Sequence, residues 1–378
     1  MPEQQNIEYK SSINDFEEYI KQGEPEKKEK GYLWQTAIGL QEVDGLKPSP
    51  YLIETAKQNI EGDITIDEVK HLIDSYYKAK PAEDENDRTE EADKVSARIT
   101  EILSEKTFSF SPAEYITIHK RLFEGIYKFA GKIRDYNITK PEWVLNGETV
   151  YYASADSIRA TLDDDFEQEK QFNYRGISLL QTVQHITAFV SDLWQIHAFG
   201  EDNTRTTAVF TIKYLRTFGF NVNNDMFARH SWYFRNALVR ANYNDFKNNI
   251  HATKEYLERF FENLLLGENN ILKNKELSVE FEIKNALQSA KLVPTRQEEQ
   301  DDAISKSKIC TLNCTLEEHF VLEFLKTNPQ ATQKEIAVHI QKSERTVKTI
   351  TSNLQQKNLL ERHNGKRNGY WVVKKYRQ

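Results

Sequence analysis

The side chains best suited to chemistry lie in one short segment, residues 196–205. An apolar stretch at 177–194 precedes the segment, and a second one at 207–218 follows it. Both stretches have the length and apolar spacing of helices, so we expect a turn that exposes the N-terminus of the second helix. The free N–H groups and the dipole of a helix N-terminus favour bound anions. The segment therefore predicts an anion site of the kind that binds phosphate.

The side chains of this segment fit phosphate chemistry. A histidine such as His197 can act as a base near neutral pH, although a lone histidine beside an apolar helix is more often structural. Glu201 offers the hard oxygen ligand that Mg²⁺ prefers, while Asn203 and Arg205 carry donors for phosphate oxygens. The pattern His-x-Phe-x-Glu-x-Asn-x-Arg fixes five residue types. In a chain of this length it arises by chance in about one sequence in ten thousand, which favours the functional interpretation.

This pattern resembles the signature motif of the Fic family. The resemblance implies a protein adenylyltransferase that moves AMP from ATP to a Ser, Thr or Tyr hydroxyl of a target protein, which could be the chain itself. His197 would be the catalytic base, and Glu201 would bind Mg²⁺. A later Fic-like stretch at 237–243 corresponds to a region that, in relatives, approaches the base of the nucleotide. The implied nucleotide-binding residues are Phe199, Gly200, Asp202, Asn203, Thr204, Arg205 and Asn242.

Three positions depart from the usual Fic motif. Asp202 and Thr204 replace the two glycines that flank the asparagine, and Ala208 replaces the second arginine. Losing glycine can distort a nest of backbone N–H groups, and the Asp202 carboxylate disfavours bound phosphate unless a cation offsets it. Three functions therefore stay open: an adenylyltransferase, a Fic enzyme that transfers another phosphate-containing group, and a transcription regulator whose degenerate Fic core senses a nucleotide without catalysis.

A second Fic-like block at 122–134 is followed by a predicted β-hairpin at 143–152. Apolar residues flank Asn146 and Gly147, and an Asn-Gly pair in that setting is the strongest short-range hairpin signal. In Fic enzymes such a flap pairs with the target backbone as an added strand; an ordinary surface hairpin is the alternative. The expected docking residues are Leu145, Asn146, Gly147, Glu148, Thr149 and Val150.

The N-terminal region resembles the small helical modules that inhibit Fic enzymes. Such a module supplies a glutamate that binds the second arginine of the motif. Asp44, followed by Gly45, best matches that position, with Glu61 as a second candidate. Ala208 removes the usual partner, so Asp44 is expected to lack an arginine. The alternative is an ordinary helical packing module, in which Gly45 caps one helix and Thr65 opens another.

The last 64 residues resemble a winged helix-turn-helix. Three helices are predicted at 316–328, 332–340 and 343–356, followed by strands at 359–363 and 369–373. From residue 315 onward there are 12 Lys and Arg against 6 Glu, a charge of +6 that leaves −13 on the rest of the chain, whose total charge is −7. This asymmetry favours DNA as a partner of the tail, with protein docking as the alternative. The expected contacts are Ser343, Arg345, Thr346, Lys348, Lys366 and Arg367.

The predicted fold class is mainly α: a Fic-type helical core with a β-hairpin flap, plus a small C-terminal winged helix domain. No run of 18 apolar residues occurs, the N-terminus does not resemble a signal peptide, and only two cysteines are present. A cytoplasmic protein with no membrane partner is therefore expected. The expected domains are an N-terminal module at 1–90, the Fic core at 91–266, a bridge at 267–311 and the winged helix at 312–378.

Overall fold

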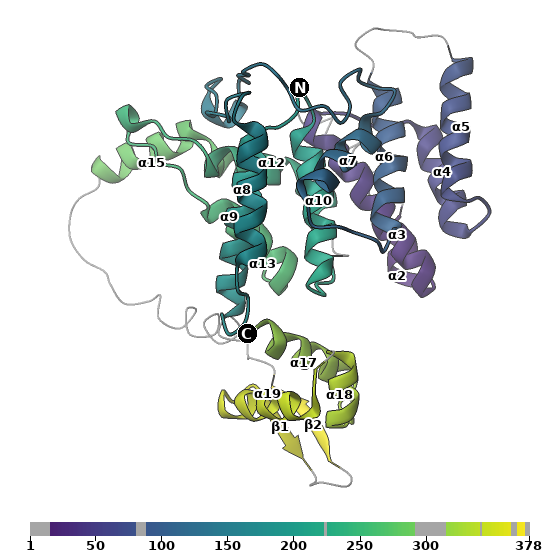
Figure 1. Cartoon of the computed structure of the whole chain (residues 1–378), viewed down its shortest axis with the longest axis vertical. Coiled ribbons are helices and arrows are strands. Elements are labelled where there is room, and N and C mark those ends of the chain that lie inside the picture. Colours follow the sequence, from purple (N-terminus) through teal and green to yellow (C-terminus); the bar gives the residue numbers. More distant parts are fainter. Residues whose placement is uncertain are drawn as a thin grey trace. The chain divides into compact units, whose positions relative to one another are not determined.

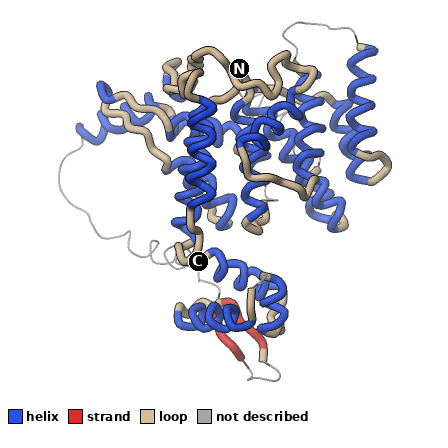
Figure 2. Tube along the Cα trace, viewed as in Figure 1, coloured by secondary structure: helices blue, strands red, loops and turns tan. Residues whose placement is uncertain are grey.

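The chain is mainly helical, as predicted from its sequence. In the computed structural model, the strands of the described residues form one small antiparallel sheet, in which Leu360 pairs with Val373 and His363 with Tyr370. Figure 2 shows these two strands among the helices. The structure describes residues 16–80, 88–222, 225–291, 315–340, 342–363 and 369–374.

Contacts divide the chain into two compact units (Figure 1). The first comprises Met1–Gln171 and Thr187–Leu292, and the second comprises Phe172–Ile186 and Val293–Gln378. The first unit contains α2 (Glu17–Gln22), α3 (Pro25–Gly39), η1 (Leu40–Asp44), α4 (Pro50–Glu61), α5 (Ile66–Ala79), α6 (Thr89–Ser104), α7 (Pro112–Phe123), η2 (Trp143–Leu145), α8 (Ile158–Gln171), α10 (Asn203–Thr217), α11 (Met226–Arg229), α12 (Ser231–Ala241), η3 (Phe246–Asn248), α13 (Glu255–Leu266), α14 (Asn274–Leu277) and α15 (Val279–Lys291). Helix α9 (Leu179–Ile196) crosses the division.

Local signals in the sequence set several helix ends of the first unit. The Ser49 hydroxyl accepts from the N–H of Leu52 at the start of α4, with Pro50 in the first turn. Thr65 and Glu68 form the predicted capping box of α5. Gly45 ends η1 in the left-handed region, with φ 68°, as predicted for a helix C-terminus.

Helix α10 lies at the centre of the first unit. All its residues from Asn203 to Leu215 are buried, and the helix contacts α6, α7 and η1. Several of these buried residues are polar or charged, so they need hydrogen-bond partners inside the unit. The segment that begins with the motif is therefore a core element that runs directly from the site into the interior.

The second unit contains α17 (Leu316–Thr327), α18 (Gln333–His339), α19 (Glu344–Gln356), β1 (Leu360–His363) and β2 (Tyr370–Val373). Its core includes Val321, Ile336, Val347, Leu354 and Trp371. The indole N–H of Trp371 donates to the carbonyl of Ala331 over 3.1 Å, which fixes β2 against the helices. The helices and strands lie close to their predicted positions. That the unit is a winged helix-turn-helix domain remains a prediction.

One predicted element differs in the structure. The β-hairpin predicted at 143–152 is wrong, because this segment forms the short 3₁₀ helix η2 and a turn. Asn146 and Gly147 do adopt the left-handed turn that their types predict, with φ 54° and 89°. Two backbone hydrogen bonds between Glu142 and residues 147–148 close the loop, too few to build a ladder.

Candidate active site

The predicted motif folds into a tight loop between α9 and α10. His197 and Asp202 both adopt left-handed backbone conformations, with φ 50° and 60°, which are uncommon for residues other than glycine. The amide of Asn203 closes the loop: its Oδ1 accepts from the N–H of Phe199 over 2.9 Å and its Nδ2 donates to the Phe199 carbonyl over 2.8 Å. The Asn203 side chain, predicted to face phosphate, is thus engaged within the protein.

Phe199 anchors the loop to the interior of the first unit. Its side chain is fully buried and stacks on the imidazole of His119 with ring centroids 3.8 Å apart. Nδ1 of His119 accepts from the N–H of Gly131 over 2.9 Å, so its Nε2 carries the proton that faces the carbonyl of Glu201 at 3.3 Å. Burial lowers the pKa of His119 to about 4. This histidine is neutral at physiological pH and holds the loop in place.

Arg134 fixes the end of helix α9. Its guanidinium donates to the carbonyls of His197, at 2.7 Å, and Ile196, at 3.3 Å, and also to those of Tyr136 and Ala153. The side chain is 4% exposed. These bonds satisfy carbonyls that the helix end leaves free and hold His197 in its left-handed conformation.

The ring of His197 is enclosed but is not hydrogen-bonded. The residue is 4% exposed, and neither ring nitrogen has a hydrogen-bond partner among the described residues. The ring of Tyr152 packs against it with centroids 4.0 Å apart. Burial, together with the charges of Lys140, Arg134 and Arg235, lowers the pKa of His197 well below its ordinary value. The imidazole is therefore neutral at pH 7, and one of its ring nitrogens carries a free lone pair.

The loop presents free backbone donors and one exposed carboxylate. In the part of the chain that the structure describes, the N–H groups of Gly200, Glu201 and Asp202 have no hydrogen-bond partner. They lie at the N-terminus of the 15-residue helix α10, where the dipole favours an anion. The Glu201 side chain is 55% exposed, and its Oε2 lies 2.6 Å from Nζ of Lys140.

A known protein family matches the part of the chain that contains this loop. The Fic/DOC family model matches residues 109–215, which include the loop. These residues are a Fic/DOC family domain. The chain is 27% identical over 144 residues to protein adenylyltransferase VbhT of Bartonella schoenbuchensis, an alignment that covers 35% of this chain and 29% of that protein. Over its whole length it is similar to 98% of a Fic family protein from Desulfovibrio desulfuricans G20, with 10% identity and a TM-score of 0.41.

Arg205 of the Fic/DOC domain points into the protein rather than toward the loop surface. It is fully buried, and each of its three nitrogens has a partner. Nε lies 2.8 Å from Oδ1 of Asp202 and 2.9 Å from Oδ2 of Asp44, while Nη1 donates to Oε1 of Gln41 over 2.6 Å. Nη2 bonds to Glu91 and again to Asp202. The expectation that Asp44 lacks an arginine is therefore wrong, because the first arginine of the motif binds it.

The N-terminal segment thus reaches the Fic/DOC motif through η1, while the second inhibitory candidate lies elsewhere. Glu61, at the end of α4, pairs with Lys27. Asp44 and Asp202 share their surroundings closely. Burial and the neighbouring Asp44 charge raise the pKa of Asp202, whereas the Arg205 guanidinium holds the pKa of Asp44 below its usual value. At neutral pH the acid cluster around Arg205 holds less than its full negative charge.

The remaining Fic-like positions divide between exposed and engaged side chains. In the loop after η2, Asn146, Gly147 and Glu148 are exposed and Thr149 is partly exposed, whereas Leu145 and Val150 are buried. The other two positions have protein partners. Thr204 Oγ1 accepts from the Trp194 indole N–H over 2.9 Å, and the amide of Asn242 donates to Ser191 and to the Leu238 carbonyl.

The structure adds site residues that the sequence analysis missed. Lys140 and Tyr152 come from the two sides of the loop around η2, and Glu142 of the same loop pairs with Arg235 of α12, at 3.0 and 3.2 Å. Glu91 joins the Arg205 cluster from α6. Of the side chains that support the loop, Arg134 lies in the stretch at 122–134 that resembles Fic cores, so the sequence contained a signal for it.

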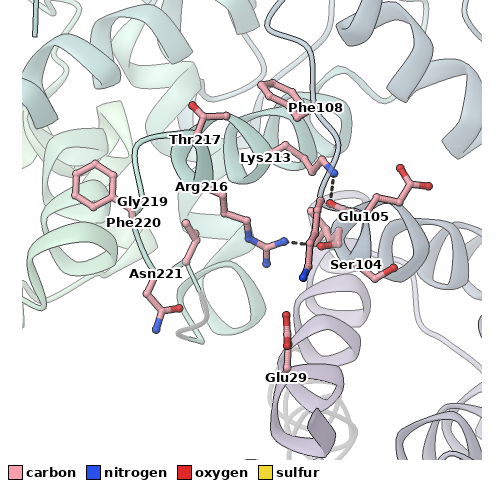
Figure 3. Close-up of a pocket in the computed structure, with 13 residues that line it drawn as sticks. Glu29, Ser104, Glu105, Phe108, Lys213, Arg216, Thr217, Gly219, Phe220 and Asn221 are labelled. Carbon is pink, nitrogen blue, oxygen red and sulfur yellow. Dashed lines mark hydrogen bonds between the residues drawn. The ribbon is translucent and has the colours of Figure 1, made fainter. Parts of the chain in front are cut away.

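A cavity of about 400 Å³ elsewhere in the first unit has a structural explanation (Figure 3). Lys213 Nζ donates to the carbonyls of Ile102, at 3.0 Å, and Glu105, at 2.6 Å, and Arg216 donates to that of Leu103 over 2.5 Å. These are carbonyls at the C-terminus of α6, where cations offset the helix dipole. The lining residues include no residue of the 196–205 segment, so this cavity is separate from the motif.

In the second unit, the predicted DNA-facing residues lie at the start of α19. Arg345 and Lys348 are exposed. Ser343 Oγ accepts from the N–H of Thr346 over 3.1 Å, so it is the N-cap of the helix. Lys366 and Arg367 lie outside the described residues.

Proposed function

We propose that this protein is an adenylyltransferase that moves AMP from ATP to a hydroxyl side chain of a protein. The observation that carries the proposal is the neutral His197 ring, without a hydrogen-bond partner among the described residues, beside the free N–H groups of Gly200, Glu201 and Asp202. A base next to an anion nest at a helix N-terminus is what phosphate transfer to a hydroxyl requires. The name of the relative VbhT supports the choice of AMP.

In the proposed reaction, a target hydroxyl oxygen attacks the α-phosphorus of ATP. The new O–P bond forms as the bond between the α-phosphorus and the bridging oxygen breaks, and pyrophosphate leaves. A ring nitrogen of His197 accepts the hydroxyl proton. The N–H groups of the loop stabilise the charge on the α-phosphate oxygens, and His119 and Arg134 keep these donors and His197 in place.

The site fits a magnesium ion with one protein carboxylate. Among the described residues, no group of three His, Cys, Asp or Glu side chains could hold a metal ion. Mg²⁺ commonly uses one or two carboxylates plus substrate phosphates, and the exposed Glu201 provides such a ligand. When bound, the ion would neutralise charge on the phosphates.

The proposal includes regulation by the N-terminal segment. Segment η1 contributes Gln41 and Asp44 to Arg205, which ties the N-terminal segment to the motif. The double change Gln41→Leu with Asp44→Asn is expected to raise transfer by releasing η1 from the motif, while Glu91 and Asp202 still hold Arg205. Transfer at the wild-type rate, in a variant that melts normally, would exclude η1 as a regulator of this kind.

The test of the function is self-labelling or target labelling with ATP radiolabelled at the α-phosphate. His197→Ala is expected to lower transfer about 10²- to 10⁴-fold, the usual contribution of a general base, while ATP affinity stays within a few-fold. ATP labelled at the γ-phosphate is the control, because it must leave no label. Equal transfer by His197→Ala would refute the role of the histidine. ATP binding without transfer by the wild type would support the nucleotide-sensing regulator instead.

For the C-terminal unit we propose DNA binding through α19. The exposed Arg345 and Lys348 and the local charge of +6 support this proposal.

No helix among the described residues has the length and apolar character needed to cross a membrane.

A further inference from the structure

Among the described residues, five cationic side chains lie at or near the motif, and three of them are committed to partners within the protein. Arg88 pairs with Glu91 of the acid cluster. Arg205 is fully buried and binds Asp44, Glu91 and Asp202. Arg134 is buried and donates to backbone carbonyls. Neither buried guanidinium can meet a nucleotide without breaking several of these bonds. The usual second arginine is absent, because Ala208 occupies its position. The charge that must offset a triphosphate therefore has another source.

The other two cations are partly exposed. Lys140, with a side chain 23% exposed, contacts the tip of the Glu201 side chain. Arg235, 21% exposed, directs one nitrogen, Nη2, at Glu142. Its helix α12 contacts both η1 and η2, which brings it between the Asp44 segment and the loop. The backbone N–H of Lys140 donates to Thr149 Oγ1 over 3.0 Å, so the two sides of the loop are joined.

The loop around η2, which carries Lys140 and the Glu142 partner of Arg235, also contacts His197. Tyr152 of this loop packs against the His197 ring, with ring centroids 4.0 Å apart. The charges of Lys140 and Arg235 both lower the pKa of His197, which agrees with this placement. Each cation is paired with only one side-chain carboxylate among the described residues, and a triphosphate offers a stronger anionic partner.

On the basis of the proposed function, we infer that Lys140 and Arg235, rather than Arg205, bind the phosphates of the nucleotide. Lys140 is placed to exchange Glu201 for a phosphate oxygen when the nucleotide enters. Arg235, whose guanidinium packs over the Trp232 ring, would use its Nε and Nη1 donors on the phosphates while Nη2 stays with Glu142. The two residues would act as substrate-binding groups that supply the positive charge missing from the altered motif.

The test compares the binding of ATP, of inorganic tripolyphosphate and of adenosine by the full-length chain, using calorimetry. Lys140→Gln and Arg235→Gln are each expected to weaken ATP and tripolyphosphate binding about tenfold to a hundredfold, the effect of losing one charge-assisted contact. Adenosine binding should not change. Arg259→Gln and Lys254→Gln are matched controls, because Arg259 pairs with Glu255 and packs on Tyr256, and Lys254 pairs with Asp192.

Because Arg235→Gln leaves the buried Glu142 without its partner, the double variant Glu142→Gln with Arg235→Gln provides the folded comparison. Thermal melts identify the variants that are folded. Unchanged ATP affinity in folded Lys140 and Arg235 variants would overturn the inference, as would an equal loss of adenosine binding. These binding results do not depend on transfer, so the inference can succeed even if the wild type transfers no AMP.

Discussion

At the scale of single residues, the environment of Arg205 decides what the altered motif can do. The guanidinium meets three carboxylates, from Asp44, Glu91 and Asp202, and Arg88 adds a second positive charge at Glu91, with Nη2 at 2.6 Å. Oδ2 of Asp44 and Oδ2 of Asp202 both lack a hydrogen-bond partner among the described residues. The cluster therefore has an excess of acids, and Arg205 is the group that makes their burial tolerable.

We therefore expect the stability of the fold to depend much more on the Arg205 side chain than on the Asp44 charge. Arg205→Met should lower the free energy of unfolding by about 3–5 kcal/mol, because it leaves buried carboxylates unpaired. Asp44→Asn should change it by less than about 1 kcal/mol, because it removes one of several crowded acids while keeping the shape of the side chain. Urea unfolding measures both. If Asp44→Asn is as costly as Arg205→Met, the charge of Asp44 is required, and the cluster does not have an excess of acids.

The sequence predicted a motif at 196–205 but not the partners of its side chains. The spacing from His197 to Arg205 pointed to a phosphate site. Two of the partners of Arg205, Gln41 and Glu91, lie 164 and 114 positions away in the chain. Such contacts depend on how helices pack, and no local pattern encodes them.

At the scale of elements, capping signals were predictable and the loop around η2 was not. Thr65 caps the helix that it was predicted to open, and Ser49 and Thr332 cap their helices by the same local hydrogen bonds. These signals act within four residues, so they survive in any packing. The hairpin prediction at 143–152 recognised the Asn146–Gly147 turn but added strands to it. Val144, Leu145 and Val150 are apolar because they are buried against the unit, not because they form a ladder.

The pair of helices α8 and α9 offers a pH test of element packing. Burial, with the nearby charges of Asp192 and Asp164, raises the pKa of Asp165 to about 6, and Lys254 lies 3.5 Å from Asp192. The folded state thus keeps a proton that the unfolded chain releases near pH 4. Stability should therefore fall as pH rises from about 4 to about 6, and Asp165→Asn should remove that fall.

At pH 7.5 we expect Asp165→Asn to be more stable than the wild type by about 1 kcal/mol, after allowing for solvent screening. At about pH 3, where this carboxyl is protonated in both the folded and the unfolded chain, the two proteins should unfold at the same urea concentration. Asp163→Asn is the matched control, because this neighbouring side chain is exposed. Equal gains for both substitutions, or a gain that does not depend on pH, would contradict the burial of Asp165.

At the scale of the whole molecule, charge is divided unequally along the chain. Residues 315–378 carry +6 and the preceding residues carry −13, although the total of −7 suggests only a mildly acidic protein. The basic segment falls within the second compact unit, whereas the Fic/DOC loop belongs to the first. A polyanion is thus attracted to one part of the chain and repelled by the other. This separation lets the DNA proposal be tested independently of nucleotide transfer.

Binding of duplex DNA by the full-length chain should weaken as salt rises, because each phosphate contact contributes about −0.9 to the slope of log affinity against log salt. Arg345 and Lys348 are exposed on α19, so replacing both by Ala should make that slope shallower by about 2 if each contacts a phosphate. Fluorescence anisotropy at salt concentrations from about 50 to about 200 mM measures this slope.

Lys326→Ala is the control, since this lysine pairs with Glu323 on α17. An unchanged slope in the double variant would exclude α19 as the DNA-contacting helix. Absence of salt-dependent binding by the wild type would favour protein docking, because a protein partner need not present a regular array of phosphates.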